Sequence, residues 1–268
     1  MSSPPLVLLK LGGSLITEKD SRRVVRRELL RALAREIGKA VRDGHRLIVG
    51  HGSGSFGHPE AAAAGLDEGI DDRNQLPGVV QTQEAARELH REVLGALSDA
   101  GAPPFSLLPG SLLVTESGVP ANLFPEPVLL ALSIKLLPVL CGDVVLDRDR
   151  GVSICSTESV LLALANRLVM DREPIARAVW LGTTDGVYDA DGRTVPELDR
   201  SRWEAMEASR STEGIDVTGG IVLRVETALL LADLGIPSVI CDGREPEHLL
   251  PALAGEPVGG TLVPETTS

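Results

Sequence analysis

The chain has 268 residues, enough to bury a large core, and its 43% hydrophobic content is too high for a disordered protein. Its 38 acidic residues outnumber its 26 basic ones, and the resulting formal charge of -12 argues against a nucleic-acid-binding surface. No apolar run reaches the roughly 20 residues that a membrane span requires. The N-terminus lacks the basic start of a secretory signal, and the three cysteines are far apart without metal-ligand spacing. We therefore expect a cytoplasmic protein with buried thiols.

Apolar runs alternate with helical periodicity along the first half of the chain. Residues 5–11 and 46–50 form short apolar runs of the kind found in buried parallel strands. Between them, a helical period extends from about residue 24 to residue 43 and stops at Gly44. The remaining elements predicted in this half are a long helix at 78–100, strands at 103–108 and 137–141, and a helix at 129–135.

The second half repeats the alternation, with helices predicted at 160–170, 220–234 and 246–254 and strands at 176–181 and 236–241. Strands alternating with helices indicate an α/β fold with a central, mostly parallel sheet covered on both faces. We expect two lobes that share one continuous sheet, residues 1–165 and residues 166–268.

Two glycine-rich turns follow the first two predicted strands. They are Lys10-Leu11-Gly12-Gly13-Ser14 and His51-Gly52-Ser53-Gly54-Ser55-Phe56-Gly57-His58. Ligands of open α/β sheets bind outside the carboxyl ends of the strands, where both turns fall. Glycine lets the backbone approach a ligand closely, and successive N–H groups can bind an anion. One Gly-Gly turn is usually an ordinary connection, but two that each carry a basic or titratable group predict a phosphate site.

Other nucleotide motifs fit less well. Residues 52–57 match the dinucleotide fingerprint G-x-G-x-x-G, but a dehydrogenase also needs an acidic residue at the end of a following strand. That region is instead the loop Gly69-Ile70-Asp71-Asp72, with no strand leading into it. Neither turn has the G-x-x-x-x-G-K-[ST] order of a P-loop.

Candidate positive groups lie close to both turns. The chain has only four lysines, and Lys10 and Lys19 flank the first turn, where a mobile point charge could follow a transferring phosphoryl group. His58 follows the second turn directly. A lone histidine is often structural, but at the rim of an anion site its ring can donate hydrogen bonds to a phosphate oxygen.

In these two turns the chain resembles the amino acid kinase superfamily and, within it, the isopentenyl phosphate kinases. Three further matches follow in the family's order: Gly142-Asp143-Val144-Val145, Asp185-Gly186-Val187-Tyr188 and Asp216-Val217-Thr218-Gly219-Gly220. The resemblance covers nearly the whole chain. It implies an open αβα sandwich, with an N-terminal lobe that binds the phosphate acceptor and a C-terminal lobe that binds ATP.

The resemblance also implies roles for individual residues. Lys10, Lys19 and His58 would be catalytic, with Lys19 neutralising the terminal phosphate and His58 binding the phosphate that the acceptor already carries. The acceptor would contact Gly54, Ser55, Gly57, His58, Gly142 and Asp143. ATP, with Mg²⁺, would lie along Lys10, Gly12, Gly13, Ser14, Asp185, Thr218, Gly219, Gly220 and Arg224.

The chain departs from the family pattern in three places. It has Ser156-Thr157-Glu158-Ser159 where Ser-Gly-Asp-Asp is usual, and Gly182-Thr183-Thr184-Asp185-Gly186 where Thr-Asp-Val-Asp-Gly is usual. Arg224 replaces an expected lysine. All three departures concern the nucleotide or the transfer step, and the metal ligands stay open.

The reaction implied is direct in-line transfer from ATP to isopentenyl phosphate, giving isopentenyl diphosphate, with dimethylallyl phosphate as a further acceptor and a homodimer as the active form. A phosphate monoester is largely ionised near neutral pH, so no strong general base is required. Small aliphatic walls for the isoprenoid tail are expected from Val79, Val80, Ala85 and Ala86. The alternatives are a fosfomycin-type phosphonate kinase of the same fold and a nucleotide-binding regulatory module without catalysis.

Overall fold

The computed structural model describes residues 4–18, 20–213 and 219–266, and for residues 209–213 and 219 it describes the backbone alone. Seven strands of this part of the chain form the main sheet, in the spatial order β11-β10-β9-β1-β2-β6-β3. Neighbours pair in parallel, except for β10 and β11. The strands are β1 (Leu6–Leu11), β2 (Arg46–His51), β3 (Pro104–Ser106), β6 (Leu137–Cys141), β9 (Ile175–Gly182), β10 (Ser238–Asp242) and β11 (Thr261–Val263). Strands from both predicted lobes thus share one sheet.

A second, smaller sheet has the order β5-β4-β7-β8. Its strands are β4 (Leu113–Glu116), β5 (Val119–Leu123), β7 (Asp143–Asp147) and β8 (Gly151–Cys155). Two antiparallel pairs, β4 with β5 and β7 with β8, are joined by a parallel pairing of β4 with β7. Because β7 begins two residues after β6 ends, this sheet extends from the carboxyl edge of the main one.

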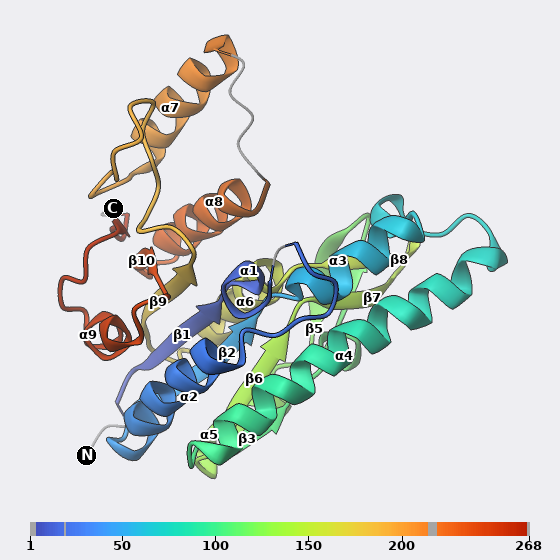
Figure 1. The fold of residues 1–268 in the computed structure, drawn as a ribbon, viewed down its shortest axis with the longest axis horizontal. Coiled ribbons are helices and arrows are strands. Elements are labelled where there is room, and N and C mark those ends of the chain that lie inside the picture. Colours follow the sequence, from blue (N-terminus) through green and yellow to red (C-terminus); the bar gives the residue numbers. More distant parts are fainter. Residues whose placement is uncertain (1–3, 19, 214–218, 267–268) are drawn as a thin grey trace.

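Helices cover both faces of the main sheet, and Figure 1 shows α2 and α4 side by side on one of them. The helices are α1 (Gly13–Ile16), α2 (Arg27–Arg42), α3 (Gly54–Ala63), α4 (Leu76–Asp99), α5 (Glu126–Ser133), α6 (Thr157–Met170), α7 (Arg200–Glu213), α8 (Gly219–Asp233) and α9 (Leu249–Ala254). In the described part of the chain, no helix combines the length and apolarity needed to cross a membrane.

The alternation of side chains along β1 divides the core in two. Val7, Leu9 and Leu11 pack with α2, α4 and α9, whereas Leu6 and Leu8 pack with α5, α6 and α8. All six residues of β1 are buried, as expected for a strand covered on both faces. The next position on the second face is Lys10, which therefore points toward α6 and α8. This arrangement confirms the predicted α/β class.

Helix α3 was not predicted, because its sequence contains two glycines and Pro59, which are poor helix formers. Pro59 has no N–H with which to bond the carbonyl oxygen of Ser55, four residues earlier. That oxygen instead accepts a hydrogen bond from the Arg23 backbone N–H at 3.3 Å. The segment before α2 thus satisfies the group that the proline leaves open, and the helix continues to Ala63.

A chain of polar groups crosses the core between β2, α4 and β3. The Nδ1 of His51 lies 3.2 Å from the Gly52 carbonyl oxygen, so this nitrogen carries the proton and Nε2 accepts. His90 then donates from Nδ1 to His51 at 2.8 Å, and its Nε2 accepts from the Ser106 hydroxyl at 2.9 Å. Both rings are neutral in this pattern. Burial lowers the pKa of His51 to about 3 and that of His90 to about 4.

Asp143, the first residue of β7, is a buried carboxyl whose pKa shifts in the opposite direction to that of the two histidines. Its Oδ1 accepts a hydrogen bond from the Val144 N–H at 2.7 Å. Burial raises the pKa of Asp143 to about 6, although the Val144 N–H, Arg87 and the Gln83 side chain act in the other direction.

We predict that the free energy of unfolding falls on acidification from pH 6 to pH 5. In this window the unfolded chain carries protons on two histidines, normal pKa about 6.5, that are neutral in the fold. The folded chain carries most of one proton on Asp143, which the unfolded chain lacks. The net difference of about one proton corresponds to a loss of about 1.4 kcal/mol per pH unit. Urea unfolding at several pH values measures this slope.

The variant Asp143→Asn removes the opposing group, so its slope should be about twice as steep over the same window. A free energy of unfolding that stays constant or rises from pH 6 to pH 5 would contradict the assignment of neutral histidines.

Candidate functional site

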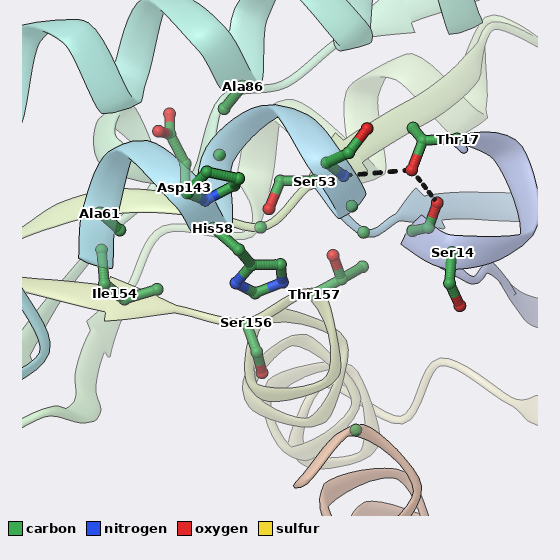
Figure 2. A pocket seen from close by; sticks show the side chains of 18 of the residues that line it. Ser14, Thr17, Ser53, His58, Ala61, Ala86, Asp143, Ile154, Ser156 and Thr157 are labelled. Atoms are coloured by element: carbon green, nitrogen blue, oxygen red, sulfur yellow. Dashed lines mark hydrogen bonds between the residues drawn. The ribbon is translucent and has the colours of Figure 1, made fainter. Parts of the chain in front are cut away.

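A cavity of about 690 Å³ opens at the carboxyl ends of β1, β2 and β6. Its walls include the first residues of α3, α6 and α8. Figure 2 shows side chains at the starts of α3 and α6, among them His58 and Thr157, converging on it. The N-terminal ends of helices present free N–H groups and a partial positive charge, which favours anions. The predicted phosphate site and this cavity therefore coincide in space.

The two glycine turns pack against each other, backbone to backbone, at the rim of this cavity. A Cβ on Gly13 would lie 2.5 Å from the Gly54 nitrogen, and a Cβ on Gly52 would lie 2.8 Å from the Gly13 nitrogen. Gly54 also has a φ of 49°, in the left-handed region that favours glycine. A side chain at any of these positions would push the turns apart.

Thr17 joins the two turns further. Its hydroxyl donates to the Gly13 carbonyl oxygen at 2.8 Å and accepts from the Ser55 N–H at 3.1 Å, as the dashed lines in Figure 2 show. The first N–H groups of α3 are thereby held beside the end of β1. Sequence reasoning missed Thr17, and its position four residues after Gly13 gives no motif that could have identified it.

Three charged groups are buried together at the end of β1. Lys10 Nζ lies 2.6 Å from Glu158 Oε1, and both side chains are less than one tenth exposed. Arg224 lines the same cavity, is 8% exposed, and forms no ion pair with a carboxylate of the described residues. The cluster carries two positive charges and one negative charge, so it retains an unpaired cation that favours a bound anion.

Burial and mutual interaction shift the ionisation of this cluster. Burial lowers the pKa of Lys10, with Arg224 acting in the same direction, while Glu158 holds it up. Lys10 and Arg224 together hold the pKa of Glu158 below its usual range despite burial. Glu158 therefore opposes the lowering of the Lys10 pKa that burial and Arg224 cause.

The segment 156–159, which departs from the family pattern, forms the N-cap and first turn of α6 and is held by its own side chains. Ser156 caps α6 by accepting from the Ser159 N–H at 3.0 Å. Thr157 donates to the His51 carbonyl oxygen at 2.6 Å and so attaches α6 to the second glycine turn. Glu158 is then directed at Lys10. The sequence analysis connected this segment with the nucleotide or the transfer step, but it did not predict that Glu158 would pair with Lys10.

His58 lies on α3 and lines the middle of the cavity. Figure 2 shows its ring directed toward Ser156 and Thr157, with Ser14 and Thr17 on one side and Ala61 and Ile154 on the other. The histidine thus marks a boundary between a polar end of the cavity and an end with small apolar side chains.

The apolar end is formed by α3, α4, β7 and β8. Its lining residues include Ala61, Thr82, Ala86, Val144, Ile154 and Cys155. Of the four aliphatic residues expected here, Ala86 is the one that lines the cavity. Ala85 packs against α2, Val79 packs with Leu66, and Val80 is 55% exposed. Positions 79, 82 and 86 share one face of α4, so the helical period does not account for Val79, which packs with Leu66 instead of lining the cavity.

The remaining predicted residues divide into three groups. Gly54, Ser55, Gly57, Gly142, Asp143, Gly13, Ser14 and Gly220 line the cavity. Gly12 lies just behind it, donating to the Leu181 carbonyl oxygen at 2.8 Å, and Gly219 is the first residue of α8. Lys19 and Thr218 lie outside the described residues.

Asp185 lies in a different hollow, of about 400 Å³, together with Asp242, Glu245 and His248. Its carboxylate accepts hydrogen bonds from the Tyr188 hydroxyl and, at 2.8 Å, from the Thr194 hydroxyl. The structure therefore does not bring Asp185 together with Lys10 and Arg224, and a contact of Asp185 with the nucleotide stays a prediction.

Comparison with known proteins relates this architecture to a family. The model of the Amino acid kinase family matches residues 5–242. An isopentenyl phosphate kinase of Methanothermobacter thermautotrophicus is 34% identical over 96% of this chain and 98% of its own length, and one of Haloferax volcanii is 33% identical over the same shares. A crystal structure of an isopentenyl phosphate kinase superposes with a TM-score of 0.80, at 30% identity, over 96% of this chain and 99% of the other. The chain therefore belongs to the amino acid kinase family.

Proposed function

We propose that this protein is an isopentenyl phosphate kinase, which transfers the terminal phosphoryl group of ATP to isopentenyl phosphate. The observation that carries the proposal is the buried cluster of Lys10, Glu158 and Arg224, in which one positive charge lacks a partner among the described residues. The full-length similarity to isopentenyl phosphate kinases supports the choice of acceptor.

The two ends of the cavity suit the two parts of such an acceptor. The small side chains near Ala61, Ala86 and Ile154 would surround an apolar tail, and His58 at their border would donate to the phosphate. The nucleotide phosphates would lie at the other end, between the first glycine turn and the start of α8.

In the transfer step, an oxygen of the acceptor phosphate attacks the terminal phosphorus of ATP. A new P–O bond forms to the acceptor while the P–O bond to ADP breaks. Two anions must meet, so the main work of the protein is to hold them in line and to neutralise charge. Lys10 and Arg224 supply that charge, and the N–H groups of the glycine turns orient the phosphate oxygens.

Mg²⁺ is proposed as the companion of ATP, because this ion binds oxygen ligands and commonly keeps substrate phosphates among them. We also expect dimethylallyl phosphate as a second acceptor, and a cytoplasmic homodimer as the working form.

The test of the proposal is ADP release with Mg-ATP in the presence of isopentenyl phosphate, dimethylallyl phosphate, fosfomycin or no acceptor. We expect both isoprenoid phosphates to stimulate ADP release above the rate without acceptor. Stimulation by fosfomycin alone would replace the proposal by a phosphonate kinase, and ATP binding without stimulated release would support a regulatory module.

Removing either proposed contact with the reacting phosphates should greatly reduce turnover. We predict that Lys10→Ala and His58→Ala each lower kcat/KM on the order of 100- to 1,000-fold, since each removes one charged or hydrogen-bonding donor. Steady-state kinetics of folded variants measures the loss, and His45→Ala, outside the cavity, is the matched control. Near-normal activity of either variant would contradict the role of that residue.

Glu158→Gln should change the pH dependence of the reaction. Without the carboxylate, the pKa of buried Lys10 falls further, so Lys10 loses its proton at a lower pH. We predict that the alkaline limb of the pH–rate profile moves to lower pH. The control is Glu173→Gln, which removes the carboxylate of an ion pair with Arg46 outside the cavity. An unchanged alkaline limb in Glu158→Gln would show that Glu158 does not keep Lys10 charged.

A further inference from the structure

Gly182, the last residue of β9, is a glycine whose backbone does not demand one. Its φ is outside the left-handed region, so other residues could adopt its conformation. Its surroundings are what leave no room for a side chain. A Cβ at this position would lie 2.6 Å from Arg224 Nη1, 3.5 Å from Cζ and 3.7 Å from Nη2. All three of the nearest atoms belong to one guanidinium group.

Arg224 occupies this space as a buried cation that forms no ion pair with a carboxylate of the described residues. Its Nε has no hydrogen-bond partner among the described residues, and Glu158, the carboxylate that acts on it, lies beyond ion-pair distance and is engaged by Lys10. A buried guanidinium in this state is costly unless an anion reaches it. Since Arg224 lines the cavity beside Lys10, that anion is a ligand of the cavity.

We infer that Gly182 is a positioning residue for Arg224: the missing side chain at 182 forms the slot that fixes the guanidinium beside Lys10, ready to bind the phosphoryl group in transfer. The inference rests on the proposed function for the identity of that group. The slot itself rests on the contact geometry.

The slot matters because arginine and lysine bind phosphate differently. A guanidinium is planar and always charged, and it offers a rigid fork of donors, whereas an ammonium is a mobile point charge. The guanidinium group must therefore be held in one orientation to donate both hydrogen bonds to a phosphate. Gly182 on one side and the Lys10–Glu158 pair on another limit the positions that the guanidinium of Arg224 can take.

The test is a double-mutant cycle with Gly182→Ala, Arg224→Lys and the combined variant. The atom that the new methyl group meets is the far end of a side chain, so we expect the guanidinium to shift and the fold to persist. We predict that Gly182→Ala lowers kcat about 100-fold, as a displacement of about 1 Å can do, with a much smaller change in KM for isopentenyl phosphate.

A lysine at 224 has no Nη1 to displace, so Gly182→Ala should cause little further loss in the Arg224→Lys background. Thermal melting of all variants is measured in parallel. If Gly182→Ala also lowers the melting temperature, Arg224→Lys should restore it. The matched control is Gly95→Ala, on the surface of α4, where a Cβ meets no atom within 4 Å.

A wild-type kcat in Gly182→Ala would overturn the inference. So would a double variant whose loss of kcat is the product of the two single losses, or a lowered melting temperature that Arg224→Lys does not restore. The binding of AMP-PNP to the same four proteins, measured by calorimetry, separates this inference from the proposed function. Should the wild type fail to phosphorylate isopentenyl phosphate, a non-additive loss of AMP-PNP affinity would still support the slot, and additive losses would still refute it.

Discussion

The contact between the backbones of the two glycine turns is the constraint on which the rest of the site depends. Strands β1 and β2 are hydrogen-bonded neighbours, so the chain leaves them at two points only about 4.8 Å apart. At that separation there is room for two backbones and for no side chain at Gly13 or Gly52. The close approach brings the end of β1, which carries Lys10, next to the first turn of α3, which leads to His58. Thr17 then fixes the spacing through hydrogen bonds to both turns. A charge for the transferring phosphate and a donor for the acceptor phosphate are thus positioned by one packing contact.

The two-residue period of β1 determines which partners Lys10 meets. Leu6, Leu8 and Lys10 face α6 and α8, so the lysine emerges from the core where these two helices begin. Glu158 comes from the first turn of α6 and Arg224 from the second turn of α8. The site is therefore an extension of the packing pattern of the sheet, with charged residues at the positions where the apolar layer ends. Its retained positive charge is compatible with an overall charge of -12, because the cationic groups are buried together whereas the acidic excess is spread over the chain.

Sequence patterns were sufficient for the elements whose signals are local and strong. The parallel strands β1, β2, β6 and β9 are largely apolar runs, and α2, α4 and α6 show a clear helical period, so their approximate positions were predicted. The predicted family and α/β class are likewise confirmed.

The second sheet was missed because its strands have four or five residues, and β5 is largely exposed. Helix α3 was missed because Pro59 opposes it locally, and the backbone N–H that compensates comes from Arg23. The walls of the apolar end were only partly predicted, because the face of α4 that meets the cavity depends on how α3 and β7 pack against it.

The three departures from the family pattern lie apart in the sequence, and their geometry gives them a common explanation. Glu158 pairs with Lys10, Arg224 lies beside both, and Gly182 leaves the space that the guanidinium fills. A guanidinium needs more room than an ammonium, and a side chain at 182 would take that room. A longer carboxylate at 158 can reach Lys10 while remaining beyond ion-pair distance of Arg224. A buried phosphate site needs a net positive charge and enough space for its charged side chains. Different residues can provide both when they change together. Residues that each differ from the family pattern can therefore together form a working phosphate site. The double-mutant cycle at positions 182 and 224 tests whether these two residues depend on each other.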